Sequence, residues 1–408
     1  MMNPTAYKHN FFALIWHALF LAFASTFIDV NTVLSSFILN VGGSSIHIGV
    51  LTGITVGIPM VTQLLFAGFL AGRTQKKPYL LVGIYLRVLA LVGMGYTLSV
   101  SEYRDPRELM FMIFLWIGIF SISGAFASVS YTDILGKTFI GPQRDKFLVF
   151  KQFISASGML ISALVVRRLV NTLPYPENYA VIFLTAAGLL FVATFGFLML
   201  KETVVKNTEY ISMFLILKSI PRRLRSDKNL VNYIILINLT GLGLTTIPFY
   251  VAYSKSLFGL GKDQIGNYIL LLFIGMIFST IIWTWVAKRF RFKGIAYGSA
   301  ITGSMLPLIA LFLAGFGPEC YQWIFFMAGL SVSAQKIFVQ GMLLEITKPD
   351  NRAVYAGIAG ALSVTTALFP LIAGTLIEII GFNLIFIAIS PFVISSLYFL
   401  KKIECDRP

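Results

Sequence analysis

Charged residues are scarce in this chain. They make up 12% of its 408 residues, whereas a soluble globular protein carries about 25%. Hydrophobic residues make up 57% of the chain, and a single water-soluble core cannot bury that much apolar surface. The composition therefore excludes an ordinary soluble domain and indicates that a lipid bilayer surrounds most of the chain.

Cysteine and the common catalytic motifs are also nearly absent. The two cysteines, Cys320 and Cys405, are predicted on opposite sides of the membrane, so we do not expect them to pair. No CxxC motif or Cys/His cluster occurs, and we expect neither a metal site nor a cofactor. The chain has no GxxxxGK(S/T) loop, HExxH motif or Gly-x-Ser-x-Gly motif, which argues against ATP-driven transport by this chain and against an enzyme.

Long apolar runs take up most of the sequence, and the first follows directly on the amino-terminal residues, so no removable signal peptide is predicted. In lipid a spanning segment must be a helix or part of a closed barrel. The runs are about 20 residues long, as spanning helices require, whereas barrel strands are shorter and alternate in polarity. We predict an all-α membrane protein with twelve transmembrane helices. They cover residues 11–38, 46–70, 79–99, 109–134, 148–169, 179–200, 230–253, 264–287, 294–316, 321–345, 354–378 and 382–400.

Lysine and arginine are distributed unevenly between the predicted loops. Most of the 32 fall in segments that face the cytoplasm if both termini do. This positive-inside pattern predicts a multi-pass protein of a bacterial inner membrane with both termini in the cytoplasm. The net charge of +15 then reflects topology and attraction to anionic membrane lipids, and not nucleic-acid binding. The outer segments contain only Arg104, Arg107, Arg167, Arg168, Lys255 and Lys262.

Two loops resemble each other. The loop after the second predicted helix reads GFLAGRTQKKP (68–78), and the loop after the eighth reads TWVAKRFRFKG (284–294). Arg73 and Arg289 occupy the same place in the two loops. This similarity indicates that the chain consists of two related halves, which is one of the recognised plans for secondary transporters.

The ends of the fourth and tenth predicted helices match as well. The fourth helix closes with Asp133, and the tenth closes with Glu345. Each acid is followed by a proline and then by an arginine, Arg144 in the first half and Arg352 in the second. The duplication therefore extends beyond the two loops.

The longest predicted cytoplasmic segment joins the two halves. We predict an amino-terminal six-helix bundle over 1–200, a linker over 201–229 and a carboxy-terminal six-helix bundle over 230–408. The linker contains ISMFLILKSIPRRLR, an apolar stretch that ends in a basic cluster. This pattern predicts a helix that lies on the membrane surface, and a plain solvated linker is the alternative.

These features resemble the major facilitator superfamily, of bacterial type and with no subfamily identified. Its signature loop reads Gly-x-x-x-Asp-Arg-x-Gly-Arg/Lys-Arg/Lys. The family's aspartate is replaced by Gly72 in the first loop and by Lys288 in the second. The resemblance nevertheless covers nearly the whole chain in helix count, orientation and duplicated loops. Four positions of the first loop fit the signature: Gly68, Arg73, Lys76 and Lys77.

The resemblance implies two pseudo-symmetric six-helix bundles and a cytoplasmic gate. In that family the loop arginine pairs with the acid at the end of the fourth helix, which implies the pairs Arg73–Asp133 and Arg289–Glu345. The alternative is that these charges only set the topology. The gate residues that the resemblance implies are Arg73, Asp133, Arg144, Arg289, Glu345 and Arg352.

Several predicted helices carry polar side chains on one face at helical spacing. Such stripes are expected to face a shared watery cavity, because lipid leaves polar groups unsatisfied. For an isolated serine or threonine, close packing between helices is the alternative interpretation. The residues assigned to a substrate or proton pathway are Asp29, Thr32, Gln63, Asn238, Lys336 and Gln340.

Ionisable residues inside the membrane are the strongest functional candidates, because a charge there is costly. Lys336 is predicted to bind an anionic group of the substrate or to cycle a proton, and a fixed ion pair is the alternative. Asp29 is predicted to carry a proton or a cation, and a gate or a helix cap is the alternative. Arg87 is predicted to snorkel towards the interface or to brace a helix end.

The sequence thus predicts a secondary active transporter that moves a small organic solute by alternating access. We expect proton coupling, as a symporter or antiporter, and a monomer in contact with membrane lipids. A transport-inactive receptor or assembly subunit is the alternative, because the signature loops lack their family acids.

Overall fold

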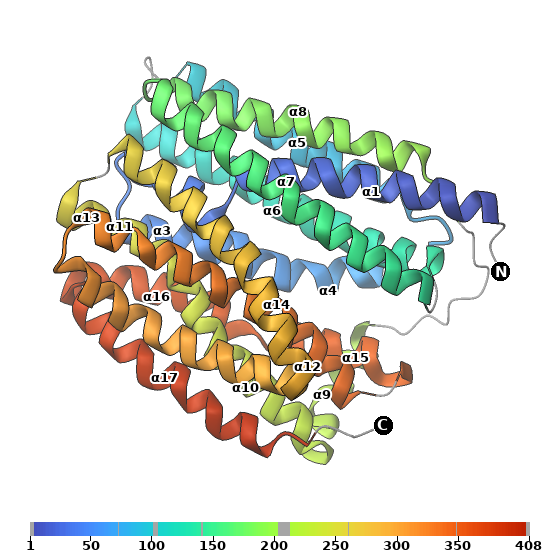
Figure 1. Cartoon of the computed structure of the whole chain (residues 1–408). Helices are drawn as coiled ribbons and strands as arrows, with labels where there is room; N and C mark the ends of the chain where they lie inside the picture. Colours follow the sequence, from blue (N-terminus) through green and yellow to red (C-terminus); the bar gives the residue numbers. More distant parts are fainter. Residues whose placement is uncertain are drawn as a thin grey trace. The chain divides into compact units, whose positions relative to one another are not determined.

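The computed structural model of the chain describes residues 4–71, 73–100, 105–139, 142–202, 213–259, 261–347 and 349–404 (Figure 1). All regular secondary structure in these residues is helical, which confirms the predicted all-α class. The chain divides into two compact units. Unit 1 consists of residues 1–29 and 61–213, and unit 2 consists of residues 30–60 and 214–408.

Unit 1 is built from long helices. In unit 1, α1 and α5 both pack along α8, and α5 also packs along α6 (Figure 1). Small residues permit these close crossings: a Cβ atom added at Gly196 would lie 2.3 Å from the carbonyl oxygen of Ala13. The helices are α1 (Pro4–Phe27), the end of α4 (Ile58–Ala71), α5 (Lys77–Ser99), α6 (Pro106–Thr138), α7 (Pro142–Thr172) and α8 (Glu177–Met199).

Unit 2 contains the remaining helices. In it α12 packs along α14 and α17, and α16 packs along α3 and α10. The elements are η1 (Val30–Leu34), α2 (Ser35–Asn40), α3 (Ser45–Thr52), η2 (Gly53–Gly57), the start of α4, α9 (Met213–Ser226), α10 (Lys228–Thr245), α11 (Ile247–Phe258), α12 (Lys262–Ala314), α13 (Pro318–Tyr321), α14 (Trp323–Ile346), α15 (Pro349–Ala361), α16 (Val364–Ile380) and α17 (Phe382–Lys402).

The long element α12 is a hairpin of two helices. Its backbone leaves helical geometry at Arg291, where φ is 57° and ψ is −162°. A Cβ atom added at Gly298 would lie 2.5 Å from the ring of Trp283, although in one straight helix these residues would be about 22 Å apart. The chain therefore reverses direction at Arg291.

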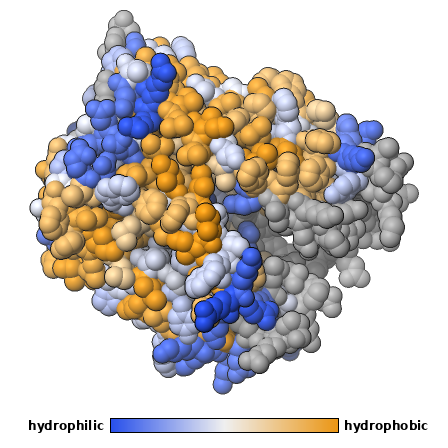
Figure 2. All heavy atoms as spheres, in the orientation of Figure 1, coloured by the Kyte–Doolittle hydropathy of each residue, from blue (hydrophilic) through white to orange (hydrophobic). Residues whose placement is uncertain are grey.

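Many large hydrophobic side chains lie on the surface. The exposed fractions of Phe12, Phe111, Ile281 and Ile379 are between 68% and 71%. On the face seen in Figure 2, hydrophobic residues cover most of the described surface, and hydrophilic residues gather in a few patches. Ten helical segments of the described residues are long and apolar enough to cross a membrane. The chain is a multi-pass membrane protein, because only lipid makes so much exposed apolar surface stable.

Three spanning segments are interrupted by short non-helical breaks. Helix α1 ends at Phe27, and residues 28–29 separate it from the π-helical turn η1. Thr246 separates α10 from α11, and residues 362–363 separate α15 from α16. In α-helical membrane proteins such breaks are tolerated where the freed backbone groups find other partners or line a cavity.

The predicted linker contains a helix, α9. Its Ile220 and Leu224 pack against the hydrophobic core of unit 2, whereas Arg222 and Arg225 are exposed. The element thus has one apolar and one basic side, as the sequence indicates. Its place on the membrane surface stays a prediction, as do the bundle boundaries at residues 200 and 230.

Candidate functional site

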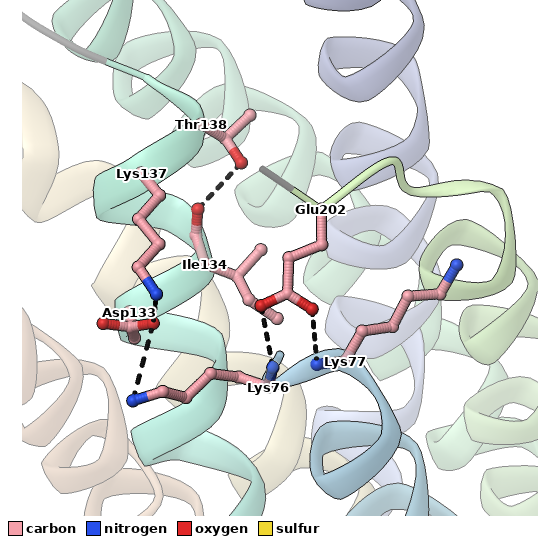
Figure 3. Close-up of polar contacts among 7 residues, drawn as sticks. All are labelled: Lys76, Lys77, Asp133, Ile134, Lys137, Thr138 and Glu202. Carbon is pink, nitrogen blue, oxygen red and sulfur yellow. Dashed lines mark hydrogen bonds and ion pairs between the residues drawn. The ribbon is translucent and has the colours of Figure 1, made fainter. Parts of the chain in front are cut away.

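Asp133, near the end of α6, is the centre of a charged cluster in unit 1 (Figure 3). The ammonium nitrogens of Lys137 and Lys76 lie 2.6 Å and 3.7 Å from its Oδ2 atom. Lys137 is one helical turn further along α6, whereas Lys76 directly precedes α5. The side chains of Lys76 and Asp133 are 6% and 29% exposed, so their charges are largely shielded from solvent. We call these three residues the Asp133 cluster.

Charged side chains also bind the two helix ends beside this cluster (Figure 3). The carboxylate of Glu202 accepts hydrogen bonds from the backbone N–H groups of Lys76 and Lys77, at 2.7 and 2.9 Å. The Lys77 ammonium donates to the carbonyl oxygens of Leu198 and Leu200, both at 2.8 Å. A carboxylate thus lies at the start of α5 and an ammonium at the end of α8, where the helix dipoles favour them.

Arg73 does not make the ion pair that the family resemblance implies. Its guanidinium lies over the rings of Phe69 and Tyr79, 5.2 and 5.8 Å from their centroids. Among the described residues the expected contact with Asp133 is made by Lys76. The physical reason is that α5 begins only at Lys77, so that Arg73 lies in the preceding turn beside aromatic rings.

The equivalent acid in unit 2 also has a different partner from the expected one. The Nε atom of Arg291 donates to Glu345 Oε1 at 2.8 Å, whereas Arg289 lies 5.5 Å from the ring centroid of Phe290. The Glu345 side chain is 6% exposed and that of Arg291 is 49% exposed. The break in α12 at Arg291 explains the change of partner. The predicted gate side chains of Arg144 and Arg352 lie outside the described residues.

The same contact joins α1 to the end of α8 in unit 1 and α10 to the end of α17 in unit 2. The Asn10 side chain donates to the carbonyl oxygen of Lys201 and accepts from its N–H, both at 2.9 Å. In unit 2, Asn229 makes the same pair of bonds with Glu404, both at 3.0 Å. Each asparagine thus satisfies both backbone groups of a residue just beyond the end of a helix.

A lysine makes a second shared contact. Lys77 donates to the carbonyl oxygen of Leu200 at 2.8 Å in unit 1, and Lys293 donates to that of Ile403 at 2.7 Å in unit 2. These lysines occupy the same place in the two similar loops. The similarity between the loops therefore extends to the contacts that they make.

Residues 30–60 form a hairpin, which we call the docked hairpin, that belongs to unit 2. The ammonium of Lys255, in α11, donates to the carbonyl oxygen of Leu39 at the end of α2. The carboxylate of Glu378, in α16, accepts from the N–H of Ile46 in the first turn of α3, at 3.1 Å. Two charged side chains thus hold the two helix ends at the tip of the hairpin, again with the signs that helix dipoles favour.

Glycine permits the docked hairpin to lie directly on α16. A Cβ atom added at Gly49 would lie 2.3 Å from the carbonyl oxygen of Pro370, and one added at Gly374 would lie 2.5 Å from that of Ser45. One added at Gly57 would lie 2.9 Å from the Cβ of Ala367. Because small residues let helix backbones approach closely in membranes, these glycines fix how tightly the hairpin docks.

Asn238, a predicted pathway residue, bridges the break between α15 and α16. Its Nδ2 donates to the carbonyl oxygen of Leu362 at 3.0 Å, and its Oδ1 accepts from the hydroxyl of Thr365. It also donates to the carbonyl oxygen of Ile234 at 2.8 Å. These contacts give Asn238 a structural role in this structure, because they satisfy polar groups at a helix break inside the membrane.

Replacing Asn238 should therefore destabilise unit 2. In Asn238→Leu the Leu362 carbonyl and the Thr365 hydroxyl lose a partner in a dry environment, which costs about 1–3 kcal/mol. The midpoint of thermal unfolding in detergent measures the effect. Thr375→Val, which removes a hydroxyl bonded only to its own helix, is the matched control. Equal midpoints for Asn238→Leu and the wild type would contradict the assigned role.

Lys336 and Gln340 lie one turn apart on α14, and both are exposed. The apolar Trp323 and Met327 are exposed too, at 53% and 37%. At 100° per residue, Lys336 lies about 180° around the helix from Met327. The helix therefore has two exposed faces, one apolar and one polar. An apolar exposed face suits lipid, and a polar one suits a watery cavity.

Gln335, next to Lys336, is a buried residue that sequence reasoning missed. Its side chain is 7% exposed and connects three helices. Its Nε2 donates to the Thr240 hydroxyl, and its Oε1 accepts from the Ser299 hydroxyl, both at 3.0 Å. These bonds connect α14 to α10 and α12, and Gln335 therefore supports the position of α14 within unit 2.

The remaining predicted pathway residues lie near the amino-terminal helix break. Asp29 is partly exposed and lies within the break itself, and Thr32 is buried in the following π-helical turn. The side chain of Gln63 lies outside the described residues. A break beside an acid was not predicted, because no proline or glycine marks it in the sequence.

The interior of unit 1 contains cationic side chains. The guanidinium of Arg87 lies 4.1 Å from the centroid of Phe120, and its buried Nε has no hydrogen-bond partner among the described residues. Lys151 donates to the hydroxyl of Tyr131 at 3.1 Å. The buried His17, which the sequence reasoning did not single out, is 5% exposed and lies beside these residues as an aromatic neighbour, with 3.8 Å between its ring centroid and that of Phe197. Arg87 thus lies over an aromatic ring inside the bundle.

The chain has the fold of the major facilitator transporters. No known family profile and no characterised protein sequence matches it. It is similar to the solved structure of a mutant of the nucleoside transporter NupG, with a TM-score of 0.73, 14% identity and coverage of 97% of this chain and 99% of the other. It is also similar to a POT family transporter in complex with 5-aminolevulinic acid, with a TM-score of 0.71, 13% identity and coverage of 98% of this chain and 97% of the other. For a D-xylose–proton symporter the TM-score is 0.67, the identity is 14%, and the coverage is 97% of this chain and 98% of the other. At these identities the similarity establishes the fold.

Proposed function

We propose that this chain is a secondary active transporter that moves a small organic solute across the membrane by alternating access. The observation that carries the proposal is the docked hairpin. It belongs to unit 2 by its contacts, yet the chain on both sides of it belongs to unit 1. The chain enters unit 2 after the helix break at residues 28–29, and it returns to unit 1 at residue 61, after η2. A contact of this kind can separate and re-form while the chain flexes at those two points.

The similarity to solved structures also supports the transporter class. The solved structures that resemble it are named as nucleoside, peptide and xylose–proton transporters, and the proposal assigns this chain to the same class and not to the enzymes. Major facilitator folds carry many substrates, so the fold does not identify the solute.

We infer twelve spanning helices. Ten helical segments meet the length and polarity requirements as they stand. The hairpin in α12 adds one span, because 53 residues of helix would be about 80 Å long and a membrane core is about 30 Å thick. The segment from α3 to α4, with residues 45–71, supplies the other. The positive-inside pattern then orients both termini towards the cytoplasm of a bacterial inner membrane.

Lys336 makes an anionic or zwitterionic solute the preferred substrate. It lies on the polar exposed face of α14, where an ammonium attracts carboxylate or phosphate groups. Asp29, in the break after α1, is the proposed carrier of the coupled proton. We also propose that the Asp133 cluster and the Arg291–Glu345 pair act as the cytoplasmic gate, in place of the arginines of the family signature.

A ligand screen on the purified protein in detergent tests the proposal. The panel includes sugars, amino acids, organic and phosphorylated anions, cationic drugs and lysolipids, and the readout is the midpoint of thermal unfolding. We expect an anion to stabilise the wild type by about 2.7 kcal/mol at one hundred times its Kd. The shift should disappear in Lys336→Ala and remain in Lys218→Ala, which removes an exposed lysine outside the bundle interior.

The alternative function, a transport-inactive receptor or assembly subunit, predicts a different outcome. It was suggested by the missing acids of the signature loops, but Lys76 and Arg291 keep both gate acids paired. A ligand that stabilises the wild type, Lys336→Ala and Asp29→Asn equally would refute the site residues assigned here but would still support the transporter function. A folded sample with no hit in any class would favour the receptor or assembly subunit.

A further inference from the structure

We propose that Glu202 is the positioning residue of the Asp133 cluster: by binding the backbone at the start of α5, it presents the Lys76 ammonium to Asp133. The proposal deepens the gate assignment and rests on the proposed function for its role in transport. Its structural part stands on the contacts of unit 1 alone (Figure 3). In the signature loop the position of the family's acid is occupied by Gly72, so the loop itself offers no carboxylate there.

Glu202 binds two consecutive peptide groups. One carboxylate oxygen accepts from the N–H of Lys76, and the other accepts from that of Lys77, at 2.7 and 2.9 Å. These N–H groups belong to the residue before α5 and to its first residue, and neither has a partner within the helix. A two-point contact fixes the orientation of the backbone and not only its distance, because each oxygen has its own donor.

Glu202 is itself held in place. The preceding residue, Lys201, is bound through both its N–H and its carbonyl oxygen by the side chain of Asn10. On the other side of the contact, Lys77 reaches back to the carbonyl oxygens of Leu198 and Leu200. The result is a closed set of contacts between the start of α1, the start of α5 and the end of α8.

This arrangement directs Lys76. Its side chain leaves a backbone that Glu202 has fixed, and its ammonium lies 3.7 Å from Asp133 Oδ2 with 6% of the side chain exposed. A lysine side chain is flexible and loses much conformational freedom when it is held in one place. Fixing its backbone therefore lowers the entropic cost of holding the Lys76 ammonium beside Asp133. Lys137 needs no such help, because it shares a helix with Asp133.

Unit 2 achieves the same end by different means. Its gate cation, Arg291, has a φ of 57°, and this left-handed backbone conformation turns the chain at the break in α12. In unit 1 the Glu202 side chain orients the backbone of the gate cation, whereas in unit 2 a reversal of the backbone itself does so. The comparison predicts that the gate contact of unit 1, and not that of unit 2, depends on a single carboxylate outside the pair.

A carbodiimide cross-linking experiment tests the positioning role without any substrate. The reagent joins an ammonium to a nearby carboxylate, so Asp133 can be linked either to Lys76 or to Lys137, and mass spectrometry measures the ratio of the two products. We expect Glu202→Gln to lower the Lys76 to Lys137 ratio about tenfold, the effect of losing a charge-assisted hydrogen bond. Glu177→Gln, at the start of α8, is the matched control and should leave the ratio unchanged.

A second variant distinguishes loss of positioning from misfolding. Glu202→Asp keeps the charge but shortens the side chain, so we expect a ratio between those of the wild type and Glu202→Gln. A purely structural role would lower both products together and leave their ratio unchanged. Equal ratios in the wild type and both variants would refute the proposal. If the ratio falls as expected while the ligand screen finds no solute, the positioning role stands and the transport function fails.

Discussion

Gly49→Val should prevent the docked hairpin from closing on α16 and should abolish transport. A Cβ atom at this position would lie 2.3 Å from the carbonyl oxygen of Pro370. The obstacle is a backbone atom, which cannot rotate away as a side chain would. Overpacking of this kind costs about 1–3 kcal/mol or more, which shifts the equilibrium between docked and undocked hairpins about fivefold at the lower value and about 150-fold at the upper value.

The measurement for Gly49→Val is uptake of the solute identified by the ligand screen, in proteoliposomes. Gly188→Val in α8 is the matched control, because a Cβ atom added there meets no atom within 4 Å. We expect the control to transport at nearly the wild-type rate. A Gly49→Val protein that transports as well as the control would show that the close approach of α3 to α16 is not required in the cycle.

Asp133→Asn should be the most destabilising change in the Asp133 cluster. It leaves the Lys76 ammonium, on a side chain that is 6% exposed, without its carboxylate. Removing one partner of a buried pair costs about 3–5 kcal/mol, and we expect the lower part of this range because the Asp133 side chain is 29% exposed. The midpoint of thermal unfolding and the amount of folded protein after purification measure the loss.

Two further variants make the Asp133 experiment specific. Adding Lys76→Met to Asp133→Asn should recover part of the lost stability, because only Lys137, whose side chain is 13% exposed, then lacks its carboxylate. Glu345→Gln in unit 2 should cost less, because its partner Arg291 is 49% exposed and keeps its hydration. If Asp133→Asn and Glu345→Gln lowered the unfolding midpoint equally little, burial of Lys76 would not determine the cost of removing its partner.

The sequence was sufficient to predict the class of fold and the two acids at the ends of the fourth and tenth predicted helices. Hydropathy identifies spanning helices because lipid imposes their length and polarity. The two similar loops and the acids Asp133 and Glu345 were also identified from sequence alone. Both acids bind cations of the similar loops in the structure, although these cations are not the arginines that the family resemblance implies.

The partners of the two acids differ from those that the resemblance implies because they depend on where the backbone turns. Helix α5 begins at Lys77, which places the preceding lysine and not Arg73 against Asp133. In unit 2 the chain reverses at Arg291, and a positive φ at an arginine has no signature in the sequence. Boundaries of this kind shift by one or two residues between helices of similar sequence, and a shift of that size redirects a side chain.

The contacts inside the bundles were the least predictable. The role of Asn238 depends on a break at residues 362–363, where the sequence ALSVTT contains neither proline nor glycine. Glu202 was not singled out because its partners are backbone N–H groups of a helix that lies 125 residues earlier in the chain. Polar contacts between distant segments of this kind follow from packing, which a single sequence does not encode in a readable pattern.

The central claim is that the docked hairpin separates from α16 and returns. Spin labels at Ile46 and Ile379, which lie in α3 and α16 and are 37% and 71% exposed, report this distance in lipid nanodiscs, with Cys320 and Cys405 replaced by serine. The account predicts a short and a long distance in the wild type, with proportions that change between neutral and acidic pH, and mainly the long distance in Gly49→Val. A single short distance in the wild type under all conditions, beside a long one in Gly49→Val, would contradict it.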